Sequence, residues 1–467
     1  MSDDLNFMSA TKLAKLFAKR KASPVEVAKA CFAQIAKHEK AVNAMCLVDE
    51  KATLKQAVKS ENRWHKGDER GPLDGVPALV KDILLAKGWP TLRGSKTVDP
   101  TQKWDQDAPS VARLRAAGAV FMGMSTTPEF GWKGVTDSPK NGITRNPWDL
   151  SKTPGGSSGG SSAGLAAGYA PLALGTDGGG SIRIPASFTG TFGLKPSFGR
   201  VPAFPLSPFG SVAHIGPMTR NVGDAALMLN AITGPDTRDW TSLPHDKADY
   251  TANLAKGVKG MTFAYSPTLG YITVNPEVDR LVKTAIKVLR DLGAKVVRID
   301  PGFVDPAEMF RVLWWNGARA ALGALPPEKL ALLEPALADV VEQSRSITVE
   351  QLNEANRQRG LLGSQMRAFM EPYDALLTPM MPDVAFEAGK LQPNDPDNHG
   401  KWVNWTPFSY PFNLTQQPAA SVPCGFTKAG LPVGLQVVGR MFEDTRVMRI
   451  CAAYERATDF ANKHPKL

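Results

Sequence analysis

Three places in the sequence carry residues that could take part in nucleophilic chemistry. Lys81 follows the apolar run 76–80, Ser157 lies among glycines and serines, and Ser181 follows three successive glycines. A serine attacks a carbonyl only when a base removes its proton, and histidine is the usual base. None of the six histidines has a recognisable nucleophile context, although His214 is the most plausible. A lysine is the physical alternative if burial or nearby positive potential lowers its pKa from ~10.4 to roughly 7–8.

The glycines before Ser181 favour an oxyanion hole. Gly178, Gly179 and Gly180 can adopt backbone conformations closed to other residues, and they let a substrate carbonyl approach the main-chain amides directly. Amides from Gly178 to Ser181 aimed at one point would stabilise the developing negative charge of a tetrahedral intermediate by a few kcal/mol. The hydroxyl of Ser181 would then lie beside that hole.

The elements that must position these residues belong to an α/β fold. From residue 71 onward short β-rich runs alternate with helical stretches, which predicts a central mixed, largely parallel sheet flanked by helices on both faces. Lys81 then lies where a strand leaves the sheet, the edge at which such proteins place ligands. The expected strands are 76–81, 119–124, 171–175, 261–265, 295–299, 373–378 and 433–439, and the expected helices are 111–117, 276–292, 328–345 and 350–370.

We expect one domain over residues 1–467, made of four parts. Residues 1–70 form N-terminal helices, one of which starts at the capping box Ser23-Pro24-Val25-Glu26. The other parts are a catalytic core over 71–224, a largely helical insertion over 225–367, and a segment over 368–467 that returns to the core sheet and ends in a helix.

Composition narrows the class of protein. The net charge is +10, but lysines and arginines are scattered among acidic residues, so we expect no nucleic-acid partner. No run approaches 18 apolar residues, and the first residues lack the pattern of a secretory signal, so we expect no membrane association. The four cysteines show neither CxxC pairing nor metal-ligand spacing. They fit free thiols in the cytoplasm and a protein without a metal or other cofactor.

Three strings carry a resemblance to a known family. The strings GPLDGVPALVKD around Lys81, TPGGSSGGSSAG around Ser157 and GTDGGGSIRIPASFTGTFGLKPS around Ser181 resemble the defining motifs of the amidase signature family, in that family's order and spacing. The resemblance runs over nearly the whole chain, as far as PFNLTQQPAASVPCG and LPVGLQVVGR near the end. It implies the amidase signature fold in a single domain.

The resemblance also implies roles for individual residues. Lys81 would be the base, Ser157 a bridging serine with an unusual cis peptide, and Ser181 the nucleophile that forms an acyl-enzyme. The amides of Gly178, Gly179, Gly180 and Ser181 would form the oxyanion hole, with Asp177, Arg183 and Ser158 in structural support. The implied protein is an amidase, a hydrolase of linear carbon–nitrogen bonds. It would convert a small amide to an acid plus ammonia or an amine, and it could form a homodimer.

Other functions compete with this interpretation. Gly155-Gly156-Ser157-Ser158-Gly159 fits the nucleophile elbow of an α/β-hydrolase-type esterase, but the preceding segment 146–154 is polar and holds two prolines where the elbow needs a buried strand. Within the family, the alternative is the glutamine amidotransferase subunit that supplies ammonia for misacylated tRNA. Gln416-Gln417 stands where a Thr-Gly pair is common, and that subunit's glutamine-pocket pattern is missing.

Aromatic residues are the candidates for the substrate pocket. The candidates are Phe130, Trp132, Trp314, Trp402 and Trp405. Together they favour a substrate with an aromatic or apolar acyl group.

Overall fold

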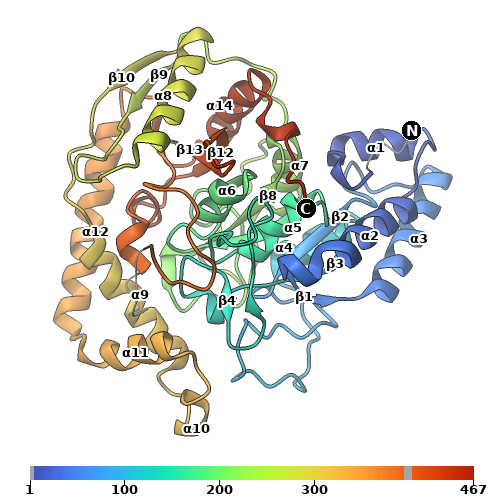
Figure 1. The fold of residues 1–467 in the computed structure, drawn as a ribbon, viewed down its shortest axis with the longest axis horizontal. Coiled ribbons are helices and arrows are strands. Elements are labelled where there is room, and N and C mark those ends of the chain that lie inside the picture. Colours follow the sequence, from blue (N-terminus) through green and yellow to red (C-terminus); the bar gives the residue numbers. More distant parts are fainter. Residues whose placement is uncertain (1–4, 394–401) are drawn as a thin grey trace.

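A computed structural model describes residues 5–393 and 402–467 of the chain. Its centre is an eleven-stranded sheet in the order β1-β3-β2-β6-β8-β7-β12-β13-β11-β9-β10. The α/β class and the central sheet flanked by helices are therefore confirmed (Figure 1). The strands are β1 (Met45–Val48), β2 (Pro77–Lys81), β3 (Val120–Ser125), β6 (Leu172–Asp177), β7 (Phe192–Lys195), β8 (His214–Thr219), β9 (Thr262–Tyr265), β10 (Lys295–Arg298), β11 (Ala375–Pro379), β12 (Ala419–Phe426) and β13 (Pro432–Val438).

The sheet is mixed, and its parallel pairs form two groups. One group is β3-β2-β6 and the other is β11-β9-β10. Between them, β6 runs antiparallel to β8, and every pair from β8 through β7, β12 and β13 to β11 is also antiparallel. The parallel group β3-β2-β6 brings the carboxyl ends of β2 and β6 to the same edge, with Lys81 at the end of one strand and Asp177 at the end of the other.

Helices cover the sheet and extend the molecule on both sides of it. Figure 1 shows α1 to α3 on one side and α9 to α12 on the other. The helices are α1 (Ala10–Ala18), α2 (Pro24–Val42), α3 (Glu50–Lys66), α4 (Pro109–Ala116), α5 (Gly159–Ala166), α6 (Arg183–Thr189), α7 (Val222–Ile232), α8 (Pro276–Asp291), α9 (Ala307–Leu322), α10 (Pro327–Leu330), α11 (Pro335–Gln343), α12 (Val349–Met370), α13 (Pro411–Leu414) and α14 (Asp444–Arg456).

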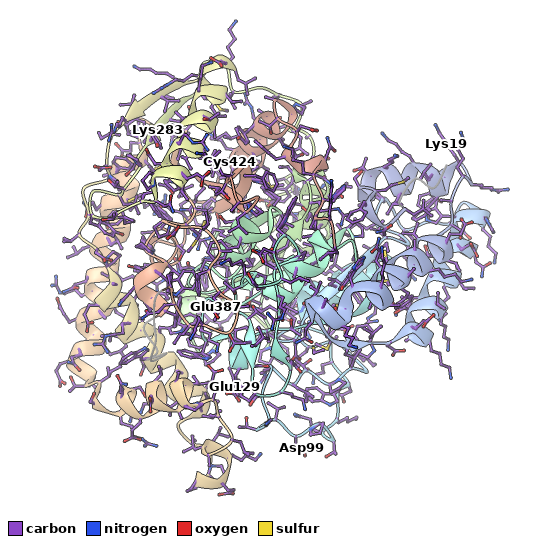
Figure 2. All side chains as sticks on the ribbon, viewed as in Figure 1. Lys19, Asp99, Glu129, Lys283, Glu387 and Cys424 are labelled. Carbon is purple, nitrogen blue, oxygen red and sulfur yellow. The ribbon has the colours of Figure 1, made fainter. Side chains whose placement is uncertain are left out.

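Local sequence explains where several helices begin and which face they bury. The Ser23 hydroxyl accepts from the Glu26 amide, and the Glu26 carboxylate accepts from the Ser23 amide, so the predicted capping box starts α2. In α8 the buried residues recur at spacings of three and four, which packs one apolar stripe against β12. Charged residues such as Lys19 and Lys283 project outward (Figure 2).

The region 225–367 contributes to the sheet as well as carrying helices. Its strands β9 and β10 pair with each other, and β9 also pairs with β11, so the sheet continues through this region. The helices α9, α11 and α12 enclose a second hydrophobic core with aromatic residues of the segment 402–412. Among the described residues, none of the helices is both long enough and apolar enough to cross a lipid bilayer.

Candidate active site

Lys81 is a buried amine held between two hydroxyl groups. Its Nζ donates to Ser157 Oγ at 2.7 Å and to Thr176 Oγ1 at 2.7 Å. Burial lowers the pKa of this amine to about 7, although the nearby Asp177 carboxylate acts in the opposite direction. A substantial fraction of the amine is therefore neutral near pH 7, and a neutral amine can accept a proton.

Ser157 is placed by a crowded turn ahead of α5. The Gly156–Ser157 peptide is cis. A Cβ at Gly156 would lie 2.4 Å from the carbonyl oxygen of Val135, so only glycine fits there. The next residue joins this turn to the second serine, because the Ser158 amide donates to the Ser181 carbonyl at 3.0 Å. The Ser158 hydroxyl also bonds to the backbone of Thr176, so the two serine-bearing segments are held together.

Ser181 lies at the end of the glycine loop 178–180, which connects β6 to α6. Its side chain faces the same cavity as Ser157. Among the described residues, the amides of Gly178, Gly179 and Ser181 have no hydrogen-bond acceptor and remain available to an oxyanion. The expectation for Gly180 needs correction, since its amide already donates to Asp177 Oδ1 at 2.8 Å.

Asp177 and Arg183 hold the glycine loop from within. Arg183 Nε donates to Asp177 Oδ2 at 2.9 Å, and both side chains are fully buried. Burial alone would raise the pKa of Asp177, but the Arg183 guanidinium holds it well below its usual range. Arg183 also donates to Asn413 Oδ1 at 2.6 Å, which ties the loop to α13. These contacts are compatible with the structural support that the family resemblance implies for the two residues.

A cavity of about 750 Å³ opens beside the two serines. Its wall is mainly apolar and includes Phe130 and Trp314 among the predicted pocket residues. Trp132, Trp402 and Trp405 are not on that wall, which corrects the prediction for these three. They are buried in the second core instead, where large aromatic rings pack on one another. Trp402 still borders the glycine loop, because a Cβ at Gly179 would lie 3.0 Å from its ring.

His214 is buried and does not contact the serines. Its Nδ1 lies 2.8 Å from the Val212 carbonyl oxygen, and its Nε2 lies 3.3 Å from Lys195 Nζ. Burial, followed by the positive charge of Lys195, lowers the pKa of His214 well below its usual value. The ring therefore stays neutral and helps to build the wall of the cavity.

Thr176 and Lys195 are two residues near the site that sequence reasoning missed. Thr176 is 95 residues from Lys81 and is an unremarkable strand residue in the sequence. Its position inside the motif GTDGGGS is the one signal that could have identified it. Lys195 lies near the end of the longer string GTDGGGSIRIPASFTGTFGLKPS. Within the described ranges, no three His, Cys, Asp or Glu side chains gather where they could hold a metal ion.

The chain is similar to known proteins along nearly its whole length. The family model described as Amidase matches residues 26–448. An acylamidase from Rhodococcus erythropolis is 35% identical over 99% of this chain and 98% of its own. A bacterial aryl acylamidase of the amidase signature family has a solved structure with a TM-score of 0.91 and 31% identity, covering 98% of both chains. One glutamyl-tRNA(Gln) amidotransferase subunit, from Chloroflexus aurantiacus, is 35% identical over 99% of both chains.

The fold and the matched family define an enzyme that hydrolyses amide carbon–nitrogen bonds. The chain belongs to the amidase signature family.

Proposed function

We propose that this protein hydrolyses a small carboxylic amide, with an aromatic or apolar acyl group, through an acyl-enzyme on Ser181. The observation that carries the proposal is the buried Lys81 amine, 2.7 Å from Ser157 Oγ, in a site whose cavity wall includes Ser157 and Ser181. The mainly apolar wall favours an apolar acyl group. The names of two relatives, an acylamidase and an aryl acylamidase, point the same way.

The proposed proton path starts from the contact between Lys81 and Ser157 and continues to Ser181, which lines the same cavity. Neutral Lys81 accepts the proton of the Ser157 hydroxyl while Ser157 Oγ accepts the proton of Ser181. Ser181 Oγ then forms a bond to the amide carbon, and the carbonyl oxygen becomes an oxyanion. The free amides of Gly178, Gly179 and Ser181 are the available donors to that oxyanion.

The tetrahedral intermediate then collapses. The carbon–nitrogen bond breaks, and the leaving nitrogen receives the proton that Ser157 and Lys81 hold, so ammonia or an amine departs. A water molecule next attacks the acyl-enzyme, with the same residues removing its proton. The acid is released and Ser181 regains its hydrogen.

One alternative keeps specific support. Relatives named as glutamyl-tRNA(Gln) amidotransferase subunits match along the whole chain at the same identity as the acylamidase. A glutaminase of that kind would act on glutamine and depend on partner proteins. Hydrolysis of simple aliphatic and aromatic amides by the purified chain favours the amidase. Activity that requires the other amidotransferase components would favour the alternative.

Covalent labelling tests the assignment of the nucleophile. A fluorophosphonate should attach to Ser181, and Ser181→Ala should abolish labelling. Ser157→Ala should slow labelling severely without preventing it, because it breaks the proton path and leaves the nucleophile in place. Peptide mass mapping after digestion locates the adduct. Ser207→Ala, which removes another hydroxyl from the cavity wall, is the matched control and should label normally.

Mapping of the adduct to Ser157 would contradict the proposal. It would instead support the nucleophile-elbow esterase. The segment before Ser157 is loop and not strand, which speaks against that elbow.

The cellular setting is also part of this proposal. All four cysteines are unpaired, which fits a reducing cytoplasm. The partner we propose is the small amide itself, and a homodimer is compatible with the function.

A further inference from the structure

Arg93 contributes a positive charge to the wall of the cavity that holds Ser157 and Ser181. The wall includes three ionisable side chains, Arg93, Asp239 and His214. His214 is buried, with its pKa well lowered. Asp239 accepts from the amides of Ala203 and Thr241 at 2.8 and 2.9 Å, so its carboxylate is already hydrogen-bonded to the neighbouring loop backbone. Arg93 is thus the one permanent cation on the described wall.

The backbone around Arg93 is firmly held. Asp82, directly after Lys81, accepts from the amides of Leu92 and Gly94 at 2.8 and 2.9 Å. The Arg93 carbonyl accepts from the Phe130 amide at 2.8 Å, and Arg93 itself has a left-handed φ of 56°. The residue is therefore anchored on both sides within the loop that follows Lys81.

The guanidinium of Arg93, unlike its backbone, makes no direct polar contact with the described residues. Among the described residues, no hydrogen bond, ion pair or aromatic ring engages it. Burial lowers the pKa of Arg93, and Asp82 offsets this only through its more distant charge. A partly buried arginine normally pairs with an acceptor, because removing its five N–H donors from water is costly.

Arg93 is connected to the serine site through Phe130 and Gly131. Phe130, which bonds to the Arg93 backbone, is followed by Gly131, where an added Cβ would lie 3.3 Å from Ser157 Oγ. Arg93, Phe130 and Gly131 all line the same cavity. A substrate bound at Ser181 therefore shares its enclosure with the free guanidinium.

We infer that Arg93 binds a carboxylate on the substrate, so that the preferred amides are apolar molecules with one acidic group. This rests on the amide hydrolysis proposed above and specifies its substrate class. A guanidinium presents a planar fork of donors that matches a carboxylate in a bidentate pair, and the apolar wall strengthens that pair. The carboxylate belongs to either the acyl part or the amine part of the substrate.

Matched substrate pairs test the inference and separate these two positions. Glutaranilic acid against valeranilide places the charge on the acyl side, and 4-acetamidobenzoate against 4-methylacetanilide places it on the amine side. The acidic member of one pair should be hydrolysed with a higher kcat/KM, by roughly tenfold to a hundredfold. The difference should be mainly in KM, because the ion pair forms on binding.

Variants assign that preference to Arg93. Arg93→Gln should remove the preference by lowering kcat/KM for the acidic amide far more than for the neutral amide, and Arg93→Lys should keep part of the preference because lysine retains charge without the fork. Arg298→Leu, which removes an exposed arginine on β10, is the matched control for net charge and should change neither value. Thermal unfolding of each variant shows whether the fold is intact.

A binding measurement separates this inference from the proposed hydrolysis. Calorimetric titration of the Ser181→Ala variant with 4-acetamidobenzoate and glutaranilate should show binding that Arg93→Gln weakens in the double variant. Such binding without turnover by the parent enzyme would overturn the hydrolysis and leave the carboxylate site standing. Equal kcat/KM values within both pairs, or an equal loss for acidic and neutral amides in Arg93→Gln, would overturn the role of Arg93.

Discussion

The strength of Lys81 as the proposed base depends on the two hydroxyls around it. Its amine donates one hydrogen bond to Ser157, the proposed link to the nucleophile, and a second to Thr176. A hydroxyl oxygen that accepts from an ammonium stabilises the charged form, so Thr176 counteracts part of the effect of burial. In the proposed mechanism, the working pH range would thus be set partly by a residue outside the proton path.

The pH profile tests this balance. The pKa of Lys81 is lowered to about 7, so the amine is protonated and inactive below that value and neutral above it. We expect kcat/KM to rise with pH through a limb centred near 7. Thr176→Val removes the acceptor that favours the charged amine, so the limb should move to lower pH. A limb near pH 4, typical of a carboxylate base, would contradict the assignment.

At the residue scale, the motifs allowed a specific hypothesis about Lys81, Ser157 and Ser181, because their residue types and spacing are distinctive. The structure brings Lys81 and Ser157 into contact and places both serines on one cavity wall. The hydrogen bond from the Gly180 amide to Asp177 could not be predicted, because it depends on the conformation of the loop. Nor does composition distinguish a half-buried aromatic ring on a cavity wall, such as Phe130, from one buried in a core, such as Trp402.

The glycine loop between β6 and α6 is an element whose shape depends on its lack of side chains. Gly180 has a φ of 122°, and a Cβ there would lie 2.5 Å from Ser409 Cβ. The Ser409 hydroxyl also donates to the Gly179 carbonyl at 2.5 Å, so the loop has no room to shift away. The orientation of the neighbouring amides is fixed by this packing.

Gly180→Ala should therefore impair catalysis. Displaced amides would stabilise the oxyanion less, and we expect kcat to fall by roughly 10²–10³ with a smaller change in KM. Gly430→Ala is the matched control, because that turn also has a positive φ, of 80°, but open space for a Cβ. It should cost about 1–2 kcal/mol of unfolding free energy and leave kcat unchanged. Steady-state kinetics give kcat and KM of the two variants, and urea unfolding gives their stability. An unchanged kcat in Gly180→Ala would refute the role of the loop.

Several elements followed from their sequence patterns and others did not. The strands β2, β3, β6, β9, β10, β11 and β13 were predicted to within a few residues. The strands β1, β7, β8 and β12 were not singled out. β8 reads His-Ile-Gly-Pro-Met-Thr, and its glycine and proline are typical of turns. It is a fully buried strand because its neighbours β6 and β7 supply the pairing, which a local pattern does not reveal.

The helical region and the catalytic core are joined by a buried polar network. Glu334, at the start of α11, accepts from the Trp132 indole and from Lys133 Nζ, the latter at 3.0 Å. Its amide donates to Glu129, 205 residues earlier, and Glu129 also accepts from Ser95 Oγ at 2.6 Å. Figure 2 labels Glu129 below the centre of the molecule. The network fixes the chain on both sides of Phe130, which lines the cavity.

Loss of the Glu334 carboxylate should weaken the whole molecule. Glu334→Ala leaves the Trp132 N–H without its acceptor and Lys133 with Asp137 as its remaining carboxylate, so we expect a loss of roughly 2–4 kcal/mol in unfolding free energy. Glu328→Ala, an exposed change on α10, should cost less than about 0.5 kcal/mol. Chemical denaturation measures the two. Equal stability of both variants would mean that the network does not join the two regions.

At the scale of the molecule, the amidase signature motifs allowed the family and the α/β class to be predicted together. The Glu334 network was invisible in the sequence, because an acidic residue on a helical segment is ordinarily a solvated one. Its partners are recognised only when α11 is seen against the segment 129–137.

The size of the cavity bears on what would become of the proposed acyl-enzyme. About 750 Å³ is within the range that holds drug-sized ligands, so a small acyl group on Ser181 leaves space unfilled once the first product has gone. Whichever nucleophile enters that space can take the acyl group. Water yields the acid, whereas an amine or hydroxylamine small enough to share the enclosure yields a new amide or hydroxamate. Lys81, Ser157 and Ser181 would then serve an exchange of acyl groups between acceptors, with the outcome governed by the concentration of each acceptor in the cavity.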